Sequence, residues 1–211
     1  MEDKNLKKRL LELHYKNKEE HVGSCFSGLD IIDDIFSKMD EKDIFILSCG
    51  HLGYALYAVL EKYHGIDAQM LIDKHGGHPH LDEENKIYCS SGSLGLGITV
   101  AVGRALADPE RTVHVLISDG ECGEGTIWES LRFIHEHNLK NIKIYVNMNG
   151  YAAYDALDTN YLENRLKAFL PDINIIKTKV NHFPFLKGIN AHYHILNESE
   201  YELGLKLLKW V

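Results

Sequence analysis

The stretch TVHVLISDGECGEGTIWESLRF, residues 112–133, decides the fold. Its first part, 112–118, is a short run rich in β-branched residues that stops at Asp119-Gly120, as a buried strand does. A helical pattern then runs from 126 to 137. A strand that passes through a glycine-rich turn into a helix is the repeating unit of a parallel α/β sheet.

The rest of the chain alternates in the same way. Further strands are expected at 44–47, 142–149 and 173–179, and further helices at 5–19, 29–38, 54–62, 94–107, 161–169 and from 198 onward. This order predicts an α/β fold with a mostly parallel sheet and helices on both faces. Because no repeat, low-complexity tract or Pro/Gly/Ser linker interrupts it, residues 1–211 are assigned to a single domain.

Composition and charge argue against several classes of partner. Of the 211 residues 45% are hydrophobic, enough to bury a core. Lys and Arg number 23 against 31 Asp and Glu, and the net charge of −8 argues against a nucleic-acid partner. The first residues are charged, and the longest apolar run, 54–60, is too short to cross a membrane. Neither nucleic acid nor membrane is expected as a partner.

The cysteines point to a reducing compartment. Cys25, Cys49, Cys89 and Cys122 form no CxxC pair and have no spacing typical of a zinc ribbon or a disulfide framework. A cytoplasmic location is therefore expected.

Two polar side chains follow predicted strands directly. Asp119 and Asn149 are expected to face one crevice, because ligands of an open parallel sheet bind beyond the carboxyl ends of its strands. A carboxylate, an amide oxygen and a backbone carbonyl such as that of Tyr151 form the donor set that Mg²⁺ or Ca²⁺ prefers. Gly120 permits close approach of a phosphate, and the helix that follows points free N–H groups at the same region. The pattern favours a metal-bridged diphosphate, although Asp-Gly and Asn-Gly are also common turns at strand ends.

Asp119-Gly120, the intervening helix and Asn149 thirty residues later resemble the thiamine diphosphate motif of the transketolase family's amino-terminal domain. Five more segments resemble segments of that family in the same order: HVGSCFSGLDIIDDIF at 21–36, SCGHLGYALYAVL at 48–60, GGHPHL at 76–81, SGSLGLGITVAVGRALA at 91–107 and INAHYHILNESEYE at 189–202. The resemblance covers nearly the whole chain. It implies the thiamine diphosphate-binding fold, in its diphosphate-type form.

The resemblance assigns the metal and the diphosphate end of the cofactor. Asp119, Asn149 and the carbonyl of Tyr151 would hold the divalent cation, Mg²⁺ or Ca²⁺, and Gly120 would contact the diphosphate. Glu124 matches a glutamate that meets the subunit interface and would connect paired active sites.

The resemblance also assigns the histidines. His51 and His192 would contact the diphosphate of thiamine diphosphate, and Gly92 and Leu94 would line its aminopyrimidine side. The histidines expected to surround the reactive carbon, and to handle the hydroxyl and carbonyl oxygens of a sugar, are His21, His51, His78 and His192.

The implied activity is transfer of a two-carbon ketol unit from a ketose to an aldose acceptor, with sugars or sugar phosphates as substrates. In the family, the glutamate that activates the aminopyrimidine comes from a second, pyrimidine-binding domain, for which 211 residues leave no room. The resemblance therefore implies one subunit of a split enzyme, active only with a pyrimidine-domain partner in a two-plus-two heterotetramer. Helices such as 126–134 would then be buried at interfaces rather than in the domain's own core.

Three positions depart from the family pattern. Val22 stands where a proline usually follows the first histidine, Cys49 stands where a lysine often precedes Gly50-His51, and Ser93 replaces the proline of the glycine-rich loop. Because these positions lie close to the expected crevice, the donor and acceptor sugars stay open.

Other functions also stay open. One is another thiamine diphosphate enzyme, either a 2-oxoacid decarboxylase or a deoxyxylulose-phosphate-type synthase, and another is a non-catalytic cofactor-binding subunit. The pairs His78-Pro-His80 and His192-Tyr-His194 leave zinc as a minor alternative, since an HxH pair on extended chain can present both rings together.

Overall fold

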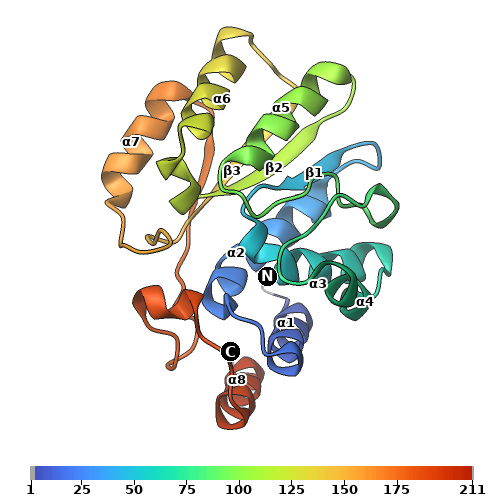
Figure 1. Cartoon of the computed structure of the whole chain (residues 1–211), viewed down its shortest axis with the longest axis vertical. Coiled ribbons are helices and arrows are strands. Elements are labelled where there is room, and N and C mark those ends of the chain that lie inside the picture. The colour runs from blue at the N-terminus through green and yellow to red at the C-terminus, as the bar shows by residue number, and fades with distance from the viewer. Residues whose placement is uncertain (1–2, 211) are drawn as a thin grey trace.

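The computed structural model describes residues 3–210. Its strands form one sheet in the order β1-β2-β3-β4, and each neighbouring pair is parallel. The strands are β1 (Ile44–Leu47), β2 (Val113–Ser118), β3 (Ile142–Met148) and β4 (Asn174–Lys177). The α-helices are α1 (Lys4–Asn17), α2 (Val22–Lys38), α3 (Gly53–His64), α4 (Ala68–His75), α5 (Leu96–Ala107), α6 (Gly125–Glu136), α7 (Thr159–Phe169) and α8 (Glu198–Trp210). The predicted α/β fold is confirmed (Figure 1).

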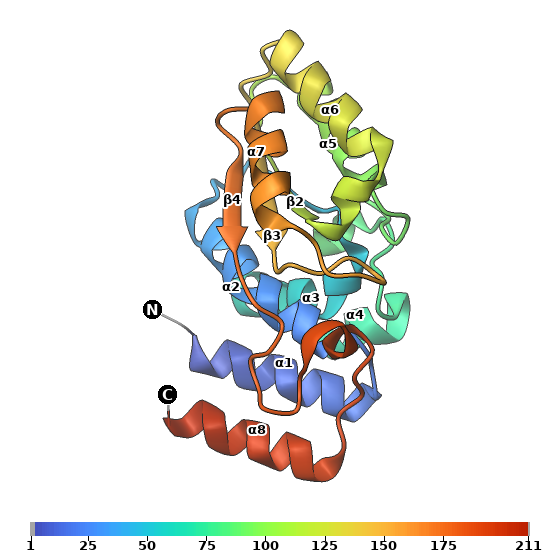
Figure 2. The ribbon, with the colours of Figure 1, turned by 90° about the vertical axis from the view of Figure 1, so that its left-hand side faces the viewer.

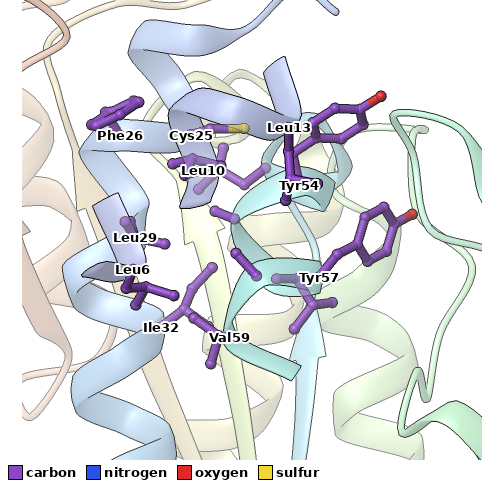
Figure 3. Packing of buried hydrophobic residues seen from close by; sticks show 14 of the residues in the cluster. Leu6, Leu10, Leu13, Cys25, Phe26, Leu29, Ile32, Tyr54, Tyr57 and Val59 are labelled. Atoms are coloured by element: carbon purple, nitrogen blue, oxygen red, sulfur yellow. The ribbon is translucent and has the colours of Figure 1, made fainter. Parts of the chain in front are cut away.

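Strands β1 and β2 are buried on both faces, and their successive side chains point into opposite layers. In β1, Phe45 and Leu47 join the core formed with α1, α2 and α3, whereas Ile44 and Ile46 join the core formed with α5, α6 and α7. This alternation follows from the period of two along a strand. Figure 3 shows side chains of the first core that come from three helices, among them Leu10 of α1, Phe26 of α2 and Tyr57 of α3.

The C-terminal helix closes the first layer from outside. In Figure 2, α8 lies alongside α1. Tyr15 and Tyr201 stack with ring centroids 4.3 Å apart, and an ideal Cβ on Gly204 would lie 2.7 Å from Leu11. Glycine at 204 therefore sets the close approach of the two helices.

The predicted helix at 29–38 begins earlier, at Val22. Its first turns carry glycine and serine, which weaken a helical pattern in sequence. Close packing explains them: an ideal Cβ on Gly23 would lie 2.6 Å from Ala191, and one on Gly28 would lie 2.1 Å from Leu52. Tertiary contact therefore selects small residues here, and the helix extends up to the site.

Two other expectations need correction. Helix α4 was not predicted, although Asp67 caps it by accepting from the N–H groups of Gln69 and Met70. The expectation that 126–134 is buried at subunit interfaces rather than in the chain's own core is wrong, because Ile127, Leu131 and Ile134 are buried in the second core.

No helix in the described range, 3–210, is long and apolar enough to cross a membrane.

Candidate functional site

A cavity of about 210 Å³ lies at the carboxyl ends of the strands. Ser118 ends β2, Asn149 follows β3, and His51 lies in the segment after β1. The cavity is lined by His21, His51, His78, Gly92, Leu94, Ser118, Gly120, Asn149, Tyr151, Ala152, Ala153, His192 and Tyr193. The structure therefore brings together all the predicted site residues except Asp119 and Glu124.

Asp119 lies just beneath the lining, with 1% of its surface exposed. One carboxylate oxygen accepts a hydrogen bond from the N–H of Gly120 at 3.1 Å, and the other accepts from the N–H of Gly150 at 2.6 Å. Burial raises the pKa of Asp119 to about 6, against the opposing effect of these backbone donors. The carboxylate is thus firmly oriented but poorly solvated.

Asn149 completes this edge. Its side-chain oxygen accepts from the N–H of Tyr151 at 3.0 Å, and its amide nitrogen lies 3.5 Å from the hydroxyl of Ser27. An ideal Cβ on Gly120 would lie 3.5 Å from the carbonyl oxygen of Tyr151, so that oxygen borders the same turn.

These residues fit a hard divalent cation. Within residues 3–210, Asp119 forms no ion pair, so its buried charge has no protein counter-charge. A carboxylate, an amide oxygen and a carbonyl oxygen are the donors that Mg²⁺ and Ca²⁺ select, and a cation would stabilise the ionised form of Asp119. The donor chemistry therefore agrees with the predicted metal set of Asp119, Asn149 and Tyr151.

A second buried acid, Glu121, supports this edge and was missed by sequence reasoning. It is fully buried. One oxygen accepts from the hydroxyl of Ser48 at 2.7 Å and the N–H of Gly95 at 2.9 Å, and the other accepts from the N–H of Ser118 at 3.0 Å. Burial raises the pKa of Glu121, although these donors favour the ionised form.

Glu121 thus ties together the end of β1, the glycine-rich loop and the end of β2. No spacing rule marks such a residue, because its partners are distant in sequence. We refer to Asp119, Glu121 and Asn149 as the acidic edge of the cavity.

The histidines form the adjoining wall. Ring centroids are 5.6 Å apart for His21 and His51, 6.0 Å for His21 and His78, and 5.7 Å for His51 and His192. We refer to these four residues as the histidine wall. Segments separated by most of the chain therefore place four imidazoles around one cavity.

Three of the four histidines in the wall are uncharged at neutral pH. Burial, followed by the charges of His192 and His78, lowers the pKa of His21 to about 4. Burial likewise lowers the pKa of His51 well below its ordinary value, and it lowers that of His192. These rings can therefore both donate and accept hydrogen bonds at neutral pH.

Local contacts fix two members of the wall. The N–H of His21 donates to the carbonyl of His192 at 2.7 Å, and His21 has a left-handed backbone, with φ of 65°, where α2 begins. The hydroxyl of Ser24 forms a short hydrogen bond with Nδ1 of His192. Ser24, which was not among the predicted residues, therefore sets the orientation of that ring.

Glu124 lies outside the cavity lining. It is exposed and occupies the position before α6, with no hydrogen bond from its side chain to the helix. This chain alone therefore gives Glu124 no contact to a ligand in the cavity.

The zinc alternative is wrong in the described structure. His80 is exposed and its ring lies near His75, while His194 pairs with Glu200 at 3.0 Å. Between residues 3 and 210 there is no group of three His, Cys, Asp or Glu side chains arranged to hold a metal. In each HxH pair the first histidine lines the cavity and the second lies outside its lining.

None of the three residues that depart from the family pattern lines the cavity. Cys49 is fully buried, and its thiol lies 3.5 Å from the carbonyl oxygen of Leu116. Val22 is buried and Ser93 is exposed. No lysine or arginine within the described range lines the cavity. The chain therefore offers imidazoles, not fixed cations, to a ligand.

A sequence profile described as "Transketolase, thiamine diphosphate binding domain" matches residues 24–169. Over 164 residues the chain is 31% identical to one subunit of the apulose-4-phosphate transketolase of Phocaeicola vulgatus, a match that covers 68% of this chain and 58% of that protein. Over 149 residues it is 30% identical to 6-deoxy-6-sulfo-D-fructose transketolase subunit SqwG of Clostridium sp., covering 61% and 54%. It thus spans little more than half the length of these relatives.

Another relative has a different named activity. Over 149 residues the chain is 30% identical to 1-deoxy-D-xylulose-5-phosphate synthase of Fusobacterium nucleatum, covering 68% of this chain and 24% of that protein.

Solved structures share the fold. Transketolase from Campylobacter jejuni superposes with a TM-score of 0.70 at 18% identity, covering 99% of this chain and 43% of that one. Transketolase from Leishmania mexicana gives a TM-score of 0.73 at 16% identity, covering 98% and 40%. At such identities the superpositions report the arrangement of the backbone alone.

Proposed function

Because this chain belongs to the transketolase family through its thiamine diphosphate binding domain, we propose that it is the diphosphate-binding subunit of a split transketolase-like enzyme. The enzyme would transfer a two-carbon ketol unit from a ketose to an aldose acceptor. Residues 1–211 would act as one cofactor-binding domain. The observation that carries the proposal is the joining of the acidic edge and the histidine wall around one cavity.

Asp119, Asn149 and the carbonyl of Tyr151 would hold Mg²⁺ or Ca²⁺, and the cation would bind the diphosphate. Asp119 forms no ion pair within residues 3–210, so its carboxylate is available to a cation, which supports this role. Gly120 would let the diphosphate approach the backbone, and His51 and His192 would donate to its oxygens. Bound there, thiamine diphosphate supplies the carbanion-stabilising chemistry of the reaction.

The histidine wall would handle the substrate. Because their pKa values are lowered, His21, His51 and His192 are neutral at working pH and able to accept a proton from a sugar hydroxyl or to donate to its oxygen. His78 borders the same cavity and would contact the same oxygens. The fixed backbone contact between His21 and His192 keeps these groups in place without a ligand.

The site requires a partner. A cavity of about 210 Å³ is smaller than the ~300–1,000 Å³ typical of small-molecule sites. Two relatives are named as subunits of transketolases, which supports a divided enzyme. We propose that a pyrimidine-domain subunit closes the cavity in a two-plus-two heterotetramer. Gly92 and Leu94 would border the aminopyrimidine, and exposed Glu124 would meet the interface.

The substrates are proposed by class. The named relatives act on phosphorylated or sulfonated sugars, and this chain would serve a related specialised sugar. Because no lysine or arginine in the described range lines its cavity, the cations for an anionic sugar would come from the partner. A cytoplasmic location belongs to the same proposal, supported by four buried cysteines that form no disulfide in the part of the chain described.

The direct test is reconstitution. The purified chain is expected to show no ketol transfer, and addition of the pyrimidine-domain subunit is expected to restore it. Activity of the solitary chain would refute the split arrangement. Cofactor binding, measured by calorimetry with Mg²⁺, tests the site independently of turnover.

A second candidate is a deoxyxylulose-phosphate-type synthase, which the Fusobacterium relative favours. It would use the same acidic edge. Consumption of pyruvate with release of carbon dioxide by the reconstituted enzyme would select this candidate, whereas a two-carbon transfer from a ketose would select the first. If the reconstituted enzyme catalysed neither reaction, the remaining alternative would be a non-catalytic cofactor-binding subunit.

A further inference from the structure

A larger cavity, of about 750 Å³, lies between α2 and the outermost strand β4. A parallel sheet normally has helices over both faces, because both carry apolar side chains. Here the chain passes from β4 into a loop that reaches the short helix at Gly188–His192. Figure 2 shows β4 at the edge of the sheet. No helix that follows β4 in the described chain therefore packs on the side of β4 that faces α2.

The floor of this cavity is apolar. Phe26, Ile31 and Ile35 line it from α2, and Tyr145 and Ile176 line it from β3 and β4. Its volume falls within the ~300–1,000 Å³ of small-molecule sites, which are mostly apolar with a few placed polar groups. The cavity therefore has the size and floor of a binding site.

Most charged groups near the cavity are already neutralised within the chain. The ion pairs are Lys7–Asp30 at 2.9 Å, Lys38–Asp34 at 2.6 Å and Lys177–Glu163 at 2.7 Å. Neither acidic residue of the lining is therefore left to repel an anion at full strength.

Two groups at the loop after β4 are different. Lys179 makes no ion pair within residues 3–210. Nε2 of His182 is buried and has no hydrogen-bond partner in that range. Both residues line the cavity. Burial, followed by the charges of Lys7 and Lys179, lowers the pKa of His182, so the lysine and the ring are electrostatically coupled. Within the described range, a lysine without an ion pair and a histidine with one unpartnered ring nitrogen thus share one end of an apolar cavity.

We propose that this cavity binds an organic anion with an apolar body, independently of the proposed function. The anionic group, whether carboxylate, phosphate or sulfonate, lies against Lys179 and His182. The apolar body covers Phe26, Ile35 and Ile176. Such a ligand gives Lys179 a counter-charge and buries apolar surface of α2 and β4 in one step.

This site adjoins the cofactor cavity without overlapping it. Ser27 lines the larger cavity, and its hydroxyl accepts from the amide of Asn147 at 2.8 Å and lies 3.5 Å from the amide of Asn149. Ser27 is therefore the wall between the two cavities. The anion and thiamine diphosphate are expected to bind together.

The test uses the full chain and the fluorescent probe 1-anilinonaphthalene-8-sulfonate, which has an aromatic body and one anionic group. Saturable binding of one probe per chain is expected. Lys179→Met is expected to weaken it about tenfold, as loss of a charge-assisted contact does. Lys187→Met, which removes an exposed charge from the same loop outside the lining, is the matched control and should leave the affinity unchanged.

A neutral analogue, N-phenyl-1-naphthylamine, separates the two parts of the site. It should bind more weakly than the sulfonate and be insensitive to Lys179→Met. Asp34→Trp places a large side chain at an exposed position of the lining and should abolish binding by filling the cavity. Removal of the Asp34 carboxylate alone would instead strengthen binding of an anion, so a loss of binding reports the steric effect.

Three results would overturn the proposal: absence of saturable binding to the wild-type chain, equal loss in the two lysine variants, or displacement of the probe by thiamine diphosphate with Mg²⁺. Circular dichroism of each variant checks that its fold is intact. Displacement by the cofactor would place the probe in the histidine cavity and leave the proposed function standing.

Discussion

The acidic edge and the histidine wall border one cavity but are held by different means. Glu121 accepts three hydrogen bonds, and both oxygens of Asp119 accept backbone N–H groups. In the wall, by contrast, only His192 has a side-chain hydrogen bond among residues 3–210, to Ser24. The rings otherwise lie against one another.

This difference indicates that the acidic edge mainly holds the structure of the site, whereas the histidine wall mainly serves its chemistry. Groups of the acidic edge are already committed to backbone donors, so they set the positions of strand ends and loops. The rings of the wall keep their nitrogens available, as groups that handle a changing substrate must. Substitutions in the edge should therefore change stability and cofactor binding, whereas substitutions in the wall should change turnover.

The largest effect is expected from Glu121→Ala. It leaves the N–H groups of Gly95 and Ser118 and the hydroxyl of Ser48 without their acceptor. We expect the free energy of unfolding to fall by about 3–5 kcal/mol, measured by urea denaturation. Glu129→Ala on the exposed side of α6 is the control and should stay within about 0.5 kcal/mol. A loss below about 1 kcal/mol would show that Glu121 does not support the edge.

Asp119→Asn should come next. The amide keeps the shape of the side chain but removes the charge that would hold the cation. Affinity for thiamine diphosphate with Mg²⁺ should fall about 100-fold, or about 2.7 kcal/mol, in calorimetric titration. The metal-free variant should remain folded. Unchanged binding would contradict the metal site.

The pH dependence of Asp119 sharpens the same distinction. Its folded-state pKa of about 6 lies above the ordinary value of 3.8, so the metal-free protein takes up a proton on folding between these pH values. Lowering the pH from 8 to 5 should stabilise the metal-free wild type by about 1.4 kcal/mol relative to Asp119→Asn. Cofactor binding should show the reverse sign and weaken below about pH 6, because the cation requires the carboxylate.

Thermal unfolding with and without Mg²⁺ and thiamine diphosphate measures both signs. If the melting temperature changed with pH in the same way with and without Mg²⁺ and cofactor, the cation would not bind at Asp119.

The smallest effect on stability is expected in the wall. His78 is partly exposed, and its ring has no hydrogen bond to another residue within the described range. His78→Ala should change the free energy of unfolding by no more than about 0.5 kcal/mol, while ketol transfer by the assembled enzyme falls. A large loss of stability would show that the wall is structural, like the edge.

Much of this site was predictable from sequence because its cues are local. Asp119 and Asn149 follow apolar strands, and the parallel topology alone places such residues at one edge. The resemblance to the transketolase family supplied the histidines, and the cavity contains all four.

The missed residues depend on contacts that sequence does not display. Glu121 gains its role from Ser48 and Gly95, and Ser24 gains its role from His192. The early start of α2 depends in the same way on Ala191, which packs against Gly23. The roles of these residues depend on buried contacts between residues that are far apart in the sequence, and no local sequence pattern marks such contacts.

The sheet order β1-β2-β3-β4 has a consequence for the folding pathway. β2, β3 and β4 are joined by single helices, so their pairing closes short loops, whereas β1 must reach β2 across the residues between Leu47 and Val113. Pulse-labelled hydrogen exchange should therefore protect the amides of β2 and β3 before those of β1. His51, His78 and the glycine-rich loop lie in that long excursion, so the newly made chain becomes competent for its cofactor only at the last step of its assembly.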